Sequence, residues 1–161
     1  MINLKRILVP TDFSPTSEAA LSYGIALTRA FNTQLVLLHI PDDPGVAAEA
    51  EYPLGIYETM QNAAHQRLGE LLSKDEVKEL KPDYVMRIGH PADEIVKFAE
   101  SHAIDLIVMG THGREGVARV LIGSVAETVV RRATCPVLTI HYPEREFVMN
   151  EEVIPTVRAS A

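Results

Sequence analysis

The residues best placed to do chemistry lie between Gly110 and Ser124, in the segment GTHGREGVARVLIGS. A short apolar run, residues 104–109, precedes this segment, and an amphipathic helical pattern follows it from Val125. In α/β proteins, a strand that ends in glycines and leads into a capped helix presents backbone N–H groups to an anion. The segment therefore indicates phosphate as the first ligand to consider.

The glycine spacing in this segment supports two interpretations. Gly110 and Gly113 bracket two residues, and Gly123-Ser124 follows after nine more. Because glycine lets a ligand approach the main chain closely, the two glycine clusters could wrap one phosphate chain. Alternatively, Gly110 only ends a strand and Ser124 only caps a helix, since Ser124 and Glu127 have capping-box spacing. Spacing alone leaves both interpretations open.

The composition limits the number of domains and the class of partner. The chain has 161 residues, with 15 basic and 22 acidic side chains and a formal net charge of −7. This length predicts one domain with a full core. An acidic chain has no overall attraction to nucleic acid or anionic membranes, so a phosphate ligand must be held locally. We therefore expect no nucleic-acid partner.

The single cysteine and the N-terminus indicate a soluble cytoplasmic protein. Cys135 has no second cysteine with which to form a disulfide or a multi-cysteine metal cluster. Its place before Pro136, at the start of an apolar run, favours a buried packing role over a nucleophile. The N-terminus, MINLKRILVPTD, lacks a signal-peptide pattern, and no apolar stretch approaches the ~20 residues of a membrane span. We expect no membrane partner.

Strands and helices are predicted to alternate along the chain. Helices are expected to begin near Ser14, Ile56, Pro91 and Ser124. The predicted strands are residues 4–9, which Pro10 stops, followed by 34–40, 83–88, 104–109 and 136–142. This alternation implies an α/β fold, a parallel sheet with helices on both faces and right-handed crossovers.

The carboxyl ends of parallel strands share one rim, where ligands bind at the point at which the strand order reverses. The segments that leave these ends begin at Pro10, Ile40, Gly89 and Gly110. If strands one and four are neighbours, Asp12 lies close to the glycine segment, where its carboxylate could orient a ribose hydroxyl or a phosphate-bound cation. The alternative role of Asp12 is an Asx turn at the start of the first helix.

These residues resemble a known family. The pattern Gly-two-Gly-nine-Gly-Ser resembles the ATP-binding motif of the universal stress protein family. The opening segment ILVPTDFSPTSEAAL resembles the first strand, Asp-bearing turn and first helix of that family, and GHPADEIVKFAESHAIDLIVMG and GSVAETVVRRATCPVLTI resemble its later segments. The resemblance covers residues 5–141. It implies a Rossmann-like, three-layer sandwich with a five-stranded parallel sheet in the order 3-2-1-4-5, and a family domain over residues 1–142.

The resemblance also implies a nucleotide site for ATP with Mg²⁺. Gly113, Gly123 and Ser124 would hold the phosphates, and Asp12 would contact the ribose or ligate the metal. No catalytic residue is implied. The other implied nucleotide-binding residues form the pocket wall, meet adenine through the main chain, or lie beside the phosphate loop: Pro10, Thr11, Ile40, Met109, Gly110, Arg114 and Val125.

Two features depart from the family pattern. Glu115 lies near the implied phosphates, where its charge would weaken ATP binding unless the side chain turns outward or binds a cation. The C-terminal tail, residues 143–161, extends past the usual end of the family domain. The tail is either disordered or packs on a partner.

The function we expect is that of an ATP-binding regulatory protein in a stress response. The chain lacks G-x-x-x-x-G-K-[ST], and His112, Arg114 and Glu115 near the glycines form no evident water-activating pair. Binding is therefore favoured over rapid hydrolysis. A slow ATP hydrolase and an interaction module that no longer uses nucleotide are the alternatives. A phosphoacceptor response regulator is discounted, because such a protein needs clustered acids after strand one and an Asp where this chain has Gly89.

The two edge strands of the implied sheet differ in charge. Strand three carries Lys81, Pro82 and Arg87, which are usual protections against edge pairing. Strand five has no charge from Val137 to Ile140. We expect a homodimer through strand five, from Val137 to Tyr142, by antiparallel pairing with the same strand of a second subunit. The family resemblance points the same way.

Overall fold

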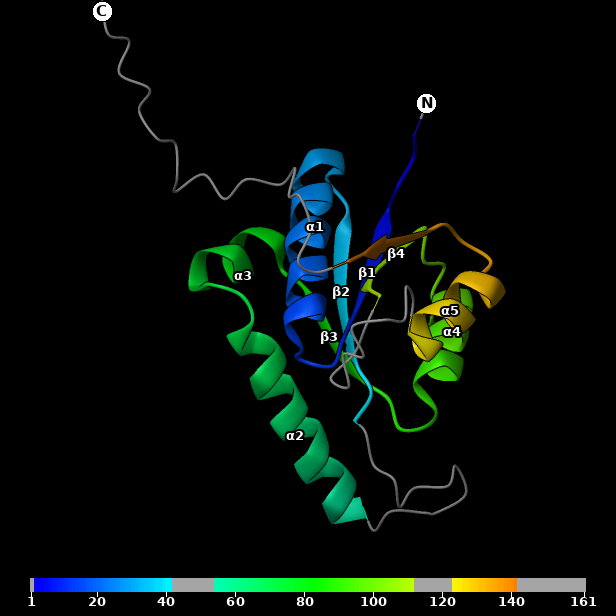
Figure 1. The fold of residues 1–161 in the computed structure, drawn as a ribbon. Coiled ribbons are helices and arrows are strands. Elements are labelled where there is room, and N and C mark those ends of the chain that lie inside the picture. Colours follow the sequence, from blue (N-terminus) through cyan, green and yellow to red (C-terminus); the bar gives the residue numbers. More distant parts are fainter. Residues whose placement is uncertain (1, 42–53, 112–122, 142–161) are drawn as a thin grey trace, which may run out of the picture.

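The computed structural model describes residues 2–41, 54–111 and 123–141 of the chain, which form an α/β sandwich (Figure 1). In chain order the elements are β1 (Arg6–Thr11), α1 (Pro15–Phe31), β2 (Gln34–His39), α2 (Leu54–Glu70), α3 (Lys74–Leu80), β3 (Asp83–Met86), α4 (Pro91–Ser101), β4 (Leu106–Gly110), α5 (Ser124–Arg132) and β5 (Val137–Ile140).

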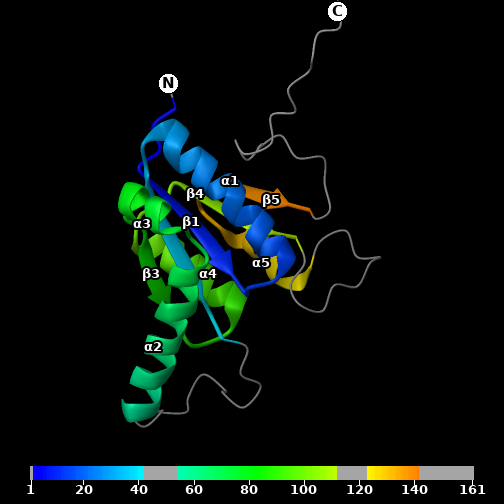
Figure 2. The same cartoon turned by 90° about the vertical axis from the view of Figure 1, so that its left-hand side faces the viewer.

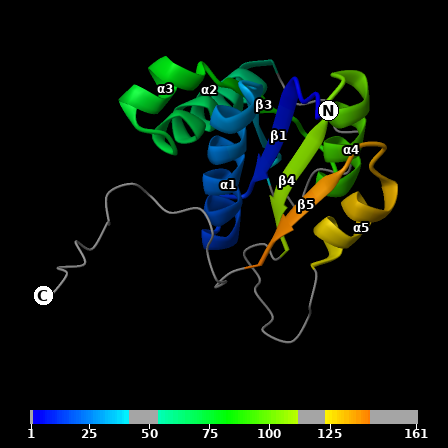
Figure 3. The same cartoon turned by 90° about the horizontal axis from the view of Figure 1, so that it is seen from above.

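The strands form one parallel sheet in the order β3-β2-β1-β4-β5. This confirms the predicted fold class and strand order. Helix α1 lies on one side of β1, β4 and β5, and helices α4 and α5 lie on the other (Figure 3). The order of the strands reverses between β1 and β4, so the carboxyl ends of these two strands form the switch point of the sheet.

Two apolar cores lie on the two faces of the sheet. Leu35 and Leu37 of β2 pack with α1 and α2, whereas Val36 and Leu38 pack with α4 and α5. All four side chains are fully buried. This double burial explains the almost uninterrupted apolar sequence of β2, since neither face of the strand meets water.

Helix α1 begins where the sequence predicted. The Ser14 hydroxyl caps the helix by accepting a hydrogen bond from the Ser17 N–H at 3.2 Å, and Pro15 occupies the first turn. A Cβ atom built on Gly24 would lie 2.5 Å from Cγ2 of Val9. The glycine therefore lets α1 rest directly on β1, the strand that leads into the predicted site.

Helix α2 packs on the sheet only through its second half. Ala64 and Leu68 are buried, whereas Ile56 near its start is 49% exposed, and the first turns extend past the sheet (Figure 2). The short helix α3 was not predicted, although Ser73 and Glu76 form a complete capping box at its start. Within the described ranges, no helix combines the length and apolar character needed to cross a bilayer.

Candidate functional site

Strand β1 continues through Pro10, so the prediction that this proline stops the strand was wrong. The Arg6 carbonyl accepts the Asp105 N–H at 3.0 Å, and by alternation Pro10 also faces β4. Pairing between β1 and β4 reaches only Leu8 with Ile107. The register pairing of β1 with β4 therefore ends just before Pro10, which has no N–H to donate to this ladder.

The turn after β1 is built around Asp12. Its Oδ1 accepts a hydrogen bond from the Ser14 N–H at 3.0 Å, which is an Asx turn. Thr11 is 6% exposed, and its carbonyl accepts a hydrogen bond from Nδ1 of His39 at 2.9 Å. The predicted Asx turn is therefore present. The turn uses Oδ1 of the carboxylate.

Gly110 ends β4 directly beneath the first turn of α1. A Cβ atom at this position would lie 2.7 Å from Cγ2 of Thr16 and 3.0 Å from its carbonyl carbon. Such distances are shorter than van der Waals contact, and the backbone carbon cannot move away by a rotamer change. Gly110 thus allows the turn that carries Asp12 to approach the end of β4.

We expect Gly110→Ala to lower the free energy of unfolding by about 1–3 kcal/mol, because the new methyl group overpacks this contact. Urea unfolding followed by circular dichroism measures the change. Gly69→Ala in α2 is the matched control, since a Cβ there meets no atom within 4 Å. The control should raise stability by roughly 0.5–1 kcal/mol. Equal stabilities of the two variants would contradict this account of Gly110.

The two glycine clusters of the sequence motif meet through Thr111, a residue that the sequence analysis did not select. Thr111 is 5% exposed. Its N–H donates to the Ile140 carbonyl at 2.8 Å, and its carbonyl accepts the Gly123 N–H at 2.5 Å. The Thr111 hydroxyl also hydrogen-bonds to Nδ1 of His141 at 3.2 Å. These bonds hold the N-terminus of α5 at the carboxyl end of β4. The position of Thr111 between Gly110 and Gly113 was the available signal.

The structure contradicts the capping box predicted for Ser124. Gly123 is the N-cap of α5, and Ser124 is the first helical residue, with an exposed side chain. The Glu127 carboxylate instead pairs with Nη2 of Arg131 at 2.7 Å, one turn further on. Since Gly123 has no side chain to act as a cap, the first turn of α5 presents backbone N–H groups of the kind that bind anions.

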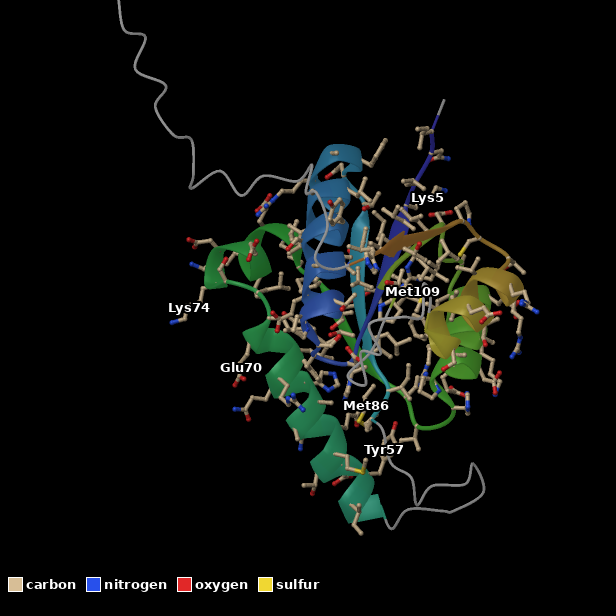
Figure 4. The ribbon with its side chains drawn as sticks, in the orientation of Figure 1. Lys5, Tyr57, Glu70, Lys74, Met86 and Met109 are labelled. Carbon is tan, nitrogen blue, oxygen red and sulfur yellow. The ribbon has the colours of Figure 1, made fainter. Side chains whose placement is uncertain are left out.

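Of the other predicted site residues, some lie within the part of the chain that the structure describes and some lie outside it. Ile40 and Met109 are 7% and 5% exposed and, with the partly buried Val125, pack in the core beneath α4 and α5. Met109 lies in the middle of the molecule, whereas Glu70 and Lys74 lie at its outer edge (Figure 4). The predictions for Gly113, Arg114 and Glu115 fall outside the described residues.

Two titratable groups near α5 have shifted pKa values. The Arg132 guanidinium hydrogen-bonds to Asp93 of α4 and holds the pKa of that carboxyl below its usual range. This exposed pair joins the two helices of one face. Burial raises the pKa of the Cys135 thiol, and the side chain packs against the core beneath α4 and α5. A protonated, packed thiol favours the predicted packing role over a nucleophile.

The geometry therefore combines the neighbouring carboxyl ends of β1 and β4, an Asp-bearing turn and a helix N-terminus with no side-chain cap. The sequence model of the universal stress protein family matches residues 3–141. The chain belongs to this family. The match includes every predicted site residue, from Pro10 to Val125.

Individual relatives agree with this assignment. Universal stress protein MJ0531 of Methanocaldococcus jannaschii is 38% identical over 149 residues, which cover 88% of this chain and 85% of that protein. The solved structure of MJ0577, a universal stress protein of the same organism, is 30% identical and has a TM-score of 0.74, covering 89% of this chain and 100% of that one. A universal stress protein solved in complex with cAMP is 26% identical, with a TM-score of 0.56 and coverage of 87% and 98%. The universal stress protein described here therefore shares its fold with these proteins, one of which was solved with a bound nucleotide.

Proposed function

We propose that this universal stress protein binds ATP with Mg²⁺ and acts as a regulatory protein in a stress response. The observation that carries the proposal is the hydrogen bond from the Gly123 N–H to the Thr111 carbonyl, at 2.5 Å. It holds the N-terminus of α5 at the carboxyl end of β4, the neighbour of β1 in the sheet. The N–H groups of the first helical turn and the positive end of the helix dipole favour a phosphate group there. The cAMP complex of a similar protein supports a nucleotide as the ligand.

The residues of the rim fit the parts of ATP. In the proposed complex, the backbone N–H groups of Ser124 and Gly113 hold phosphate oxygens. Gly123, whose own N–H donates to the Thr111 carbonyl, lets a phosphate group approach the turn closely. Asp12 contacts the ribose or the Mg²⁺ ion, and the main chain at Ile40 meets adenine. Among the described residues, no group of three or more His, Cys, Asp or Glu side chains forms a metal site. One carboxylate is enough for Mg²⁺ that is held through substrate phosphates, because this ion keeps several waters.

The proposal is binding rather than rapid hydrolysis. The rim side chains that could act as a general base already make hydrogen bonds: Asp12 with the Ser14 N–H, and His39 with the Thr11 carbonyl. Because the carbonyl can only accept, Nδ1 of His39 must carry a proton. His39 is also only 8% exposed, so it is poorly placed to activate a water molecule, and the sequence offers no water-activating pair near the glycines.

Asp12→Asn tests the proposed role of the carboxylate. Asparagine keeps an oxygen that can accept the Ser14 N–H, so the turn should survive. It removes the negative charge, so we expect ATP affinity in Mg²⁺ to fall by about tenfold or more, and the gain in affinity on adding Mg²⁺ to shrink. Isothermal titration with and without Mg²⁺ measures both quantities. Equal affinity and equal Mg²⁺ dependence in the variant would exclude Asp12 from the site.

We also propose that the protein is a homodimer through β5. This strand is one edge of the sheet, and it pairs with β4 on one side only among the described residues. The opposite edge strand, β3, is flanked by Lys81 and Arg87, whereas β5 is uncharged. An uncharged edge favours pairing with a second copy. Tyr142, the last residue of the predicted interface, lies outside the described residues.

A further inference from the structure

Phe13, directly after Asp12, has a left-handed backbone conformation with φ of 62°. This conformation is unfavourable for residues with a side chain, and it is most often adopted by Gly, Asn or Asp. Phenylalanine has no polar group with which to stabilise it locally. Contacts of the Phe13 side chain must therefore offset the cost, or the turn that carries Asp12 would relax.

The Phe13 ring contacts two side chains from other elements. The centroid of its ring is 4.5 Å from that of the His39 ring, at an interplanar angle of 54°. The guanidinium carbon of Arg67, from α2, lies 3.9 Å from the centroid of the Phe13 ring. A guanidinium at this distance from an aromatic ring makes a favourable cation–π contact. We call these three side chains the Arg67–Phe13–His39 stack.

Hydrogen bonds connect the backbone of Phe13 to the start of α1. The Phe13 N–H donates to the Thr11 hydroxyl at 3.0 Å, and that oxygen lies 3.1 Å from the Ser17 hydroxyl. The Ser17 hydroxyl in turn donates to the Ser14 carbonyl at 2.9 Å. Asp12 lies between the two residues whose bonds fix this turn, so the direction of its carboxylate depends on the backbone of Phe13.

We propose that Phe13 and Arg67 are positioning residues for nucleotide binding. The stack holds the left-handed conformation at Phe13, and this conformation directs the Asp12 carboxylate toward the ligand. The inference rests on the proposed function of the site. It adds α2, an element that carries none of the predicted site residues, to the set of elements that determine ligand affinity.

The comparison of Phe13→Ala with Phe13→Gly tests this account. Alanine removes the stack but keeps the cost of the left-handed backbone, so ATP affinity in Mg²⁺ should fall by about tenfold. Glycine removes the stack and the cost together, so the fall should be smaller, about threefold. If Phe13 were only a packing residue, glycine would be at least as damaging as alanine, because it adds backbone freedom. An affinity of Phe13→Gly equal to or below that of Phe13→Ala would overturn the proposal.

A second measurement needs no nucleotide. Amide hydrogen exchange at Ser14 reports the hydrogen bond to Asp12. We expect exchange at this amide to be fastest in Phe13→Ala, intermediate in Phe13→Gly and slowest in the unaltered chain. Unchanged exchange in Phe13→Ala would overturn the positioning role. If the unaltered chain failed to bind ATP while exchange followed this order, the proposed function would fail and the link between the stack and the Asp12 turn would stand.

Arg67→Lys distinguishes the contact of the Arg67 guanidinium with the Phe13 ring from the effect of the positive charge alone. Lysine keeps the positive charge but lacks the planar guanidinium face, so we expect ATP affinity to fall and Ser14 exchange to rise, as in Phe13→Ala but by less. Gln66→Ala, one position earlier on α2 and exposed, is the matched control and should change neither. Affinity in Arg67→Lys equal to that of the unaltered chain would mean that Arg67 acts only by attracting phosphate, against the proposal.

Discussion

Gly123→Val is expected to abolish ATP binding while the chain stays folded. Gly123 is the N-cap of α5, and in the proposed complex a phosphate group approaches its backbone. A branched side chain at this position would occupy the space of the phosphate oxygens. The loss should exceed about 100-fold, because steric exclusion removes several hydrogen bonds to charged oxygens together. Isothermal titration with ATP and Mg²⁺ measures the loss.

The backbone conformation of Gly123 makes it possible to distinguish a loss of ATP binding from a loss of folding in Gly123→Val. Its φ of −69° and ψ of 157° lie in the extended region that any residue adopts, so valine introduces no backbone strain. Circular dichroism should therefore show a native spectrum. Ser124→Ala is the neighbouring control: its exposed side chain does not cap α5, so stability should stay within about 0.5 kcal/mol. Unchanged ATP affinity in folded Gly123→Val would mean that the glycine segment is only a strand-to-helix turn.

Thr139→Pro is expected to convert the proposed homodimer to a monomer. The Pro136 carbonyl accepts a hydrogen bond from Ile107 of β4, and the Ile140 carbonyl accepts one from Thr111, the residue that follows β4. By alternation along the strand, Thr139 turns its backbone N–H away from β4, to the open edge of the sheet. Proline at this position removes a donor that a second β5 strand would need, without removing a bond to β4. Analytical ultracentrifugation at micromolar concentration distinguishes the two states.

Leu138→Pro is the comparison for this experiment, because Leu138 faces β4 by the same alternation. Proline there should lower the stability of the subunit itself, by about 3 kcal/mol or more if the cost resembles that in a helix. A Thr139→Pro protein that stays dimeric would exclude β5 as the interface. A monomeric unaltered chain would exclude the dimer altogether.

Local sequence patterns correctly predicted the helices and strands that are amphipathic or fully apolar. They failed where the role of a residue depends on contacts with residues far away in the chain. The apolar run of β2 and the Ser14-Pro15 start of α1 were both confirmed. The strand order came from the family resemblance, because parallel pairing joins residues far apart in the chain. Pro10 was wrongly taken to stop β1, since the strand stays paired with β2 through Thr11.

The sequence predicted which segments at the carboxyl ends of the strands form the candidate site, but it did not predict the contacts between them. Ser124 has the spacing of a capping box with Glu127, yet Gly123 is the N-cap, because the hydrogen bond from its N–H to Thr111 sets where the chain enters the helix. Phe13 gave no signal in the sequence. Its role depends on a backbone angle and on Arg67 of α2, and neither can be inferred from residue spacing.

The most direct test of the account is isothermal titration of ATP and Mg²⁺ into the unaltered chain. A parallel sample of the same protein is denatured to detect any nucleotide that was carried through purification. We expect saturable binding of one ATP per chain, or release of ATP or ADP from the denatured sample, and neither in folded Gly123→Val. The absence of both binding and released nucleotide in the unaltered, folded chain would contradict the proposal that the N-terminus of α5 and the Asp12 turn form an ATP site.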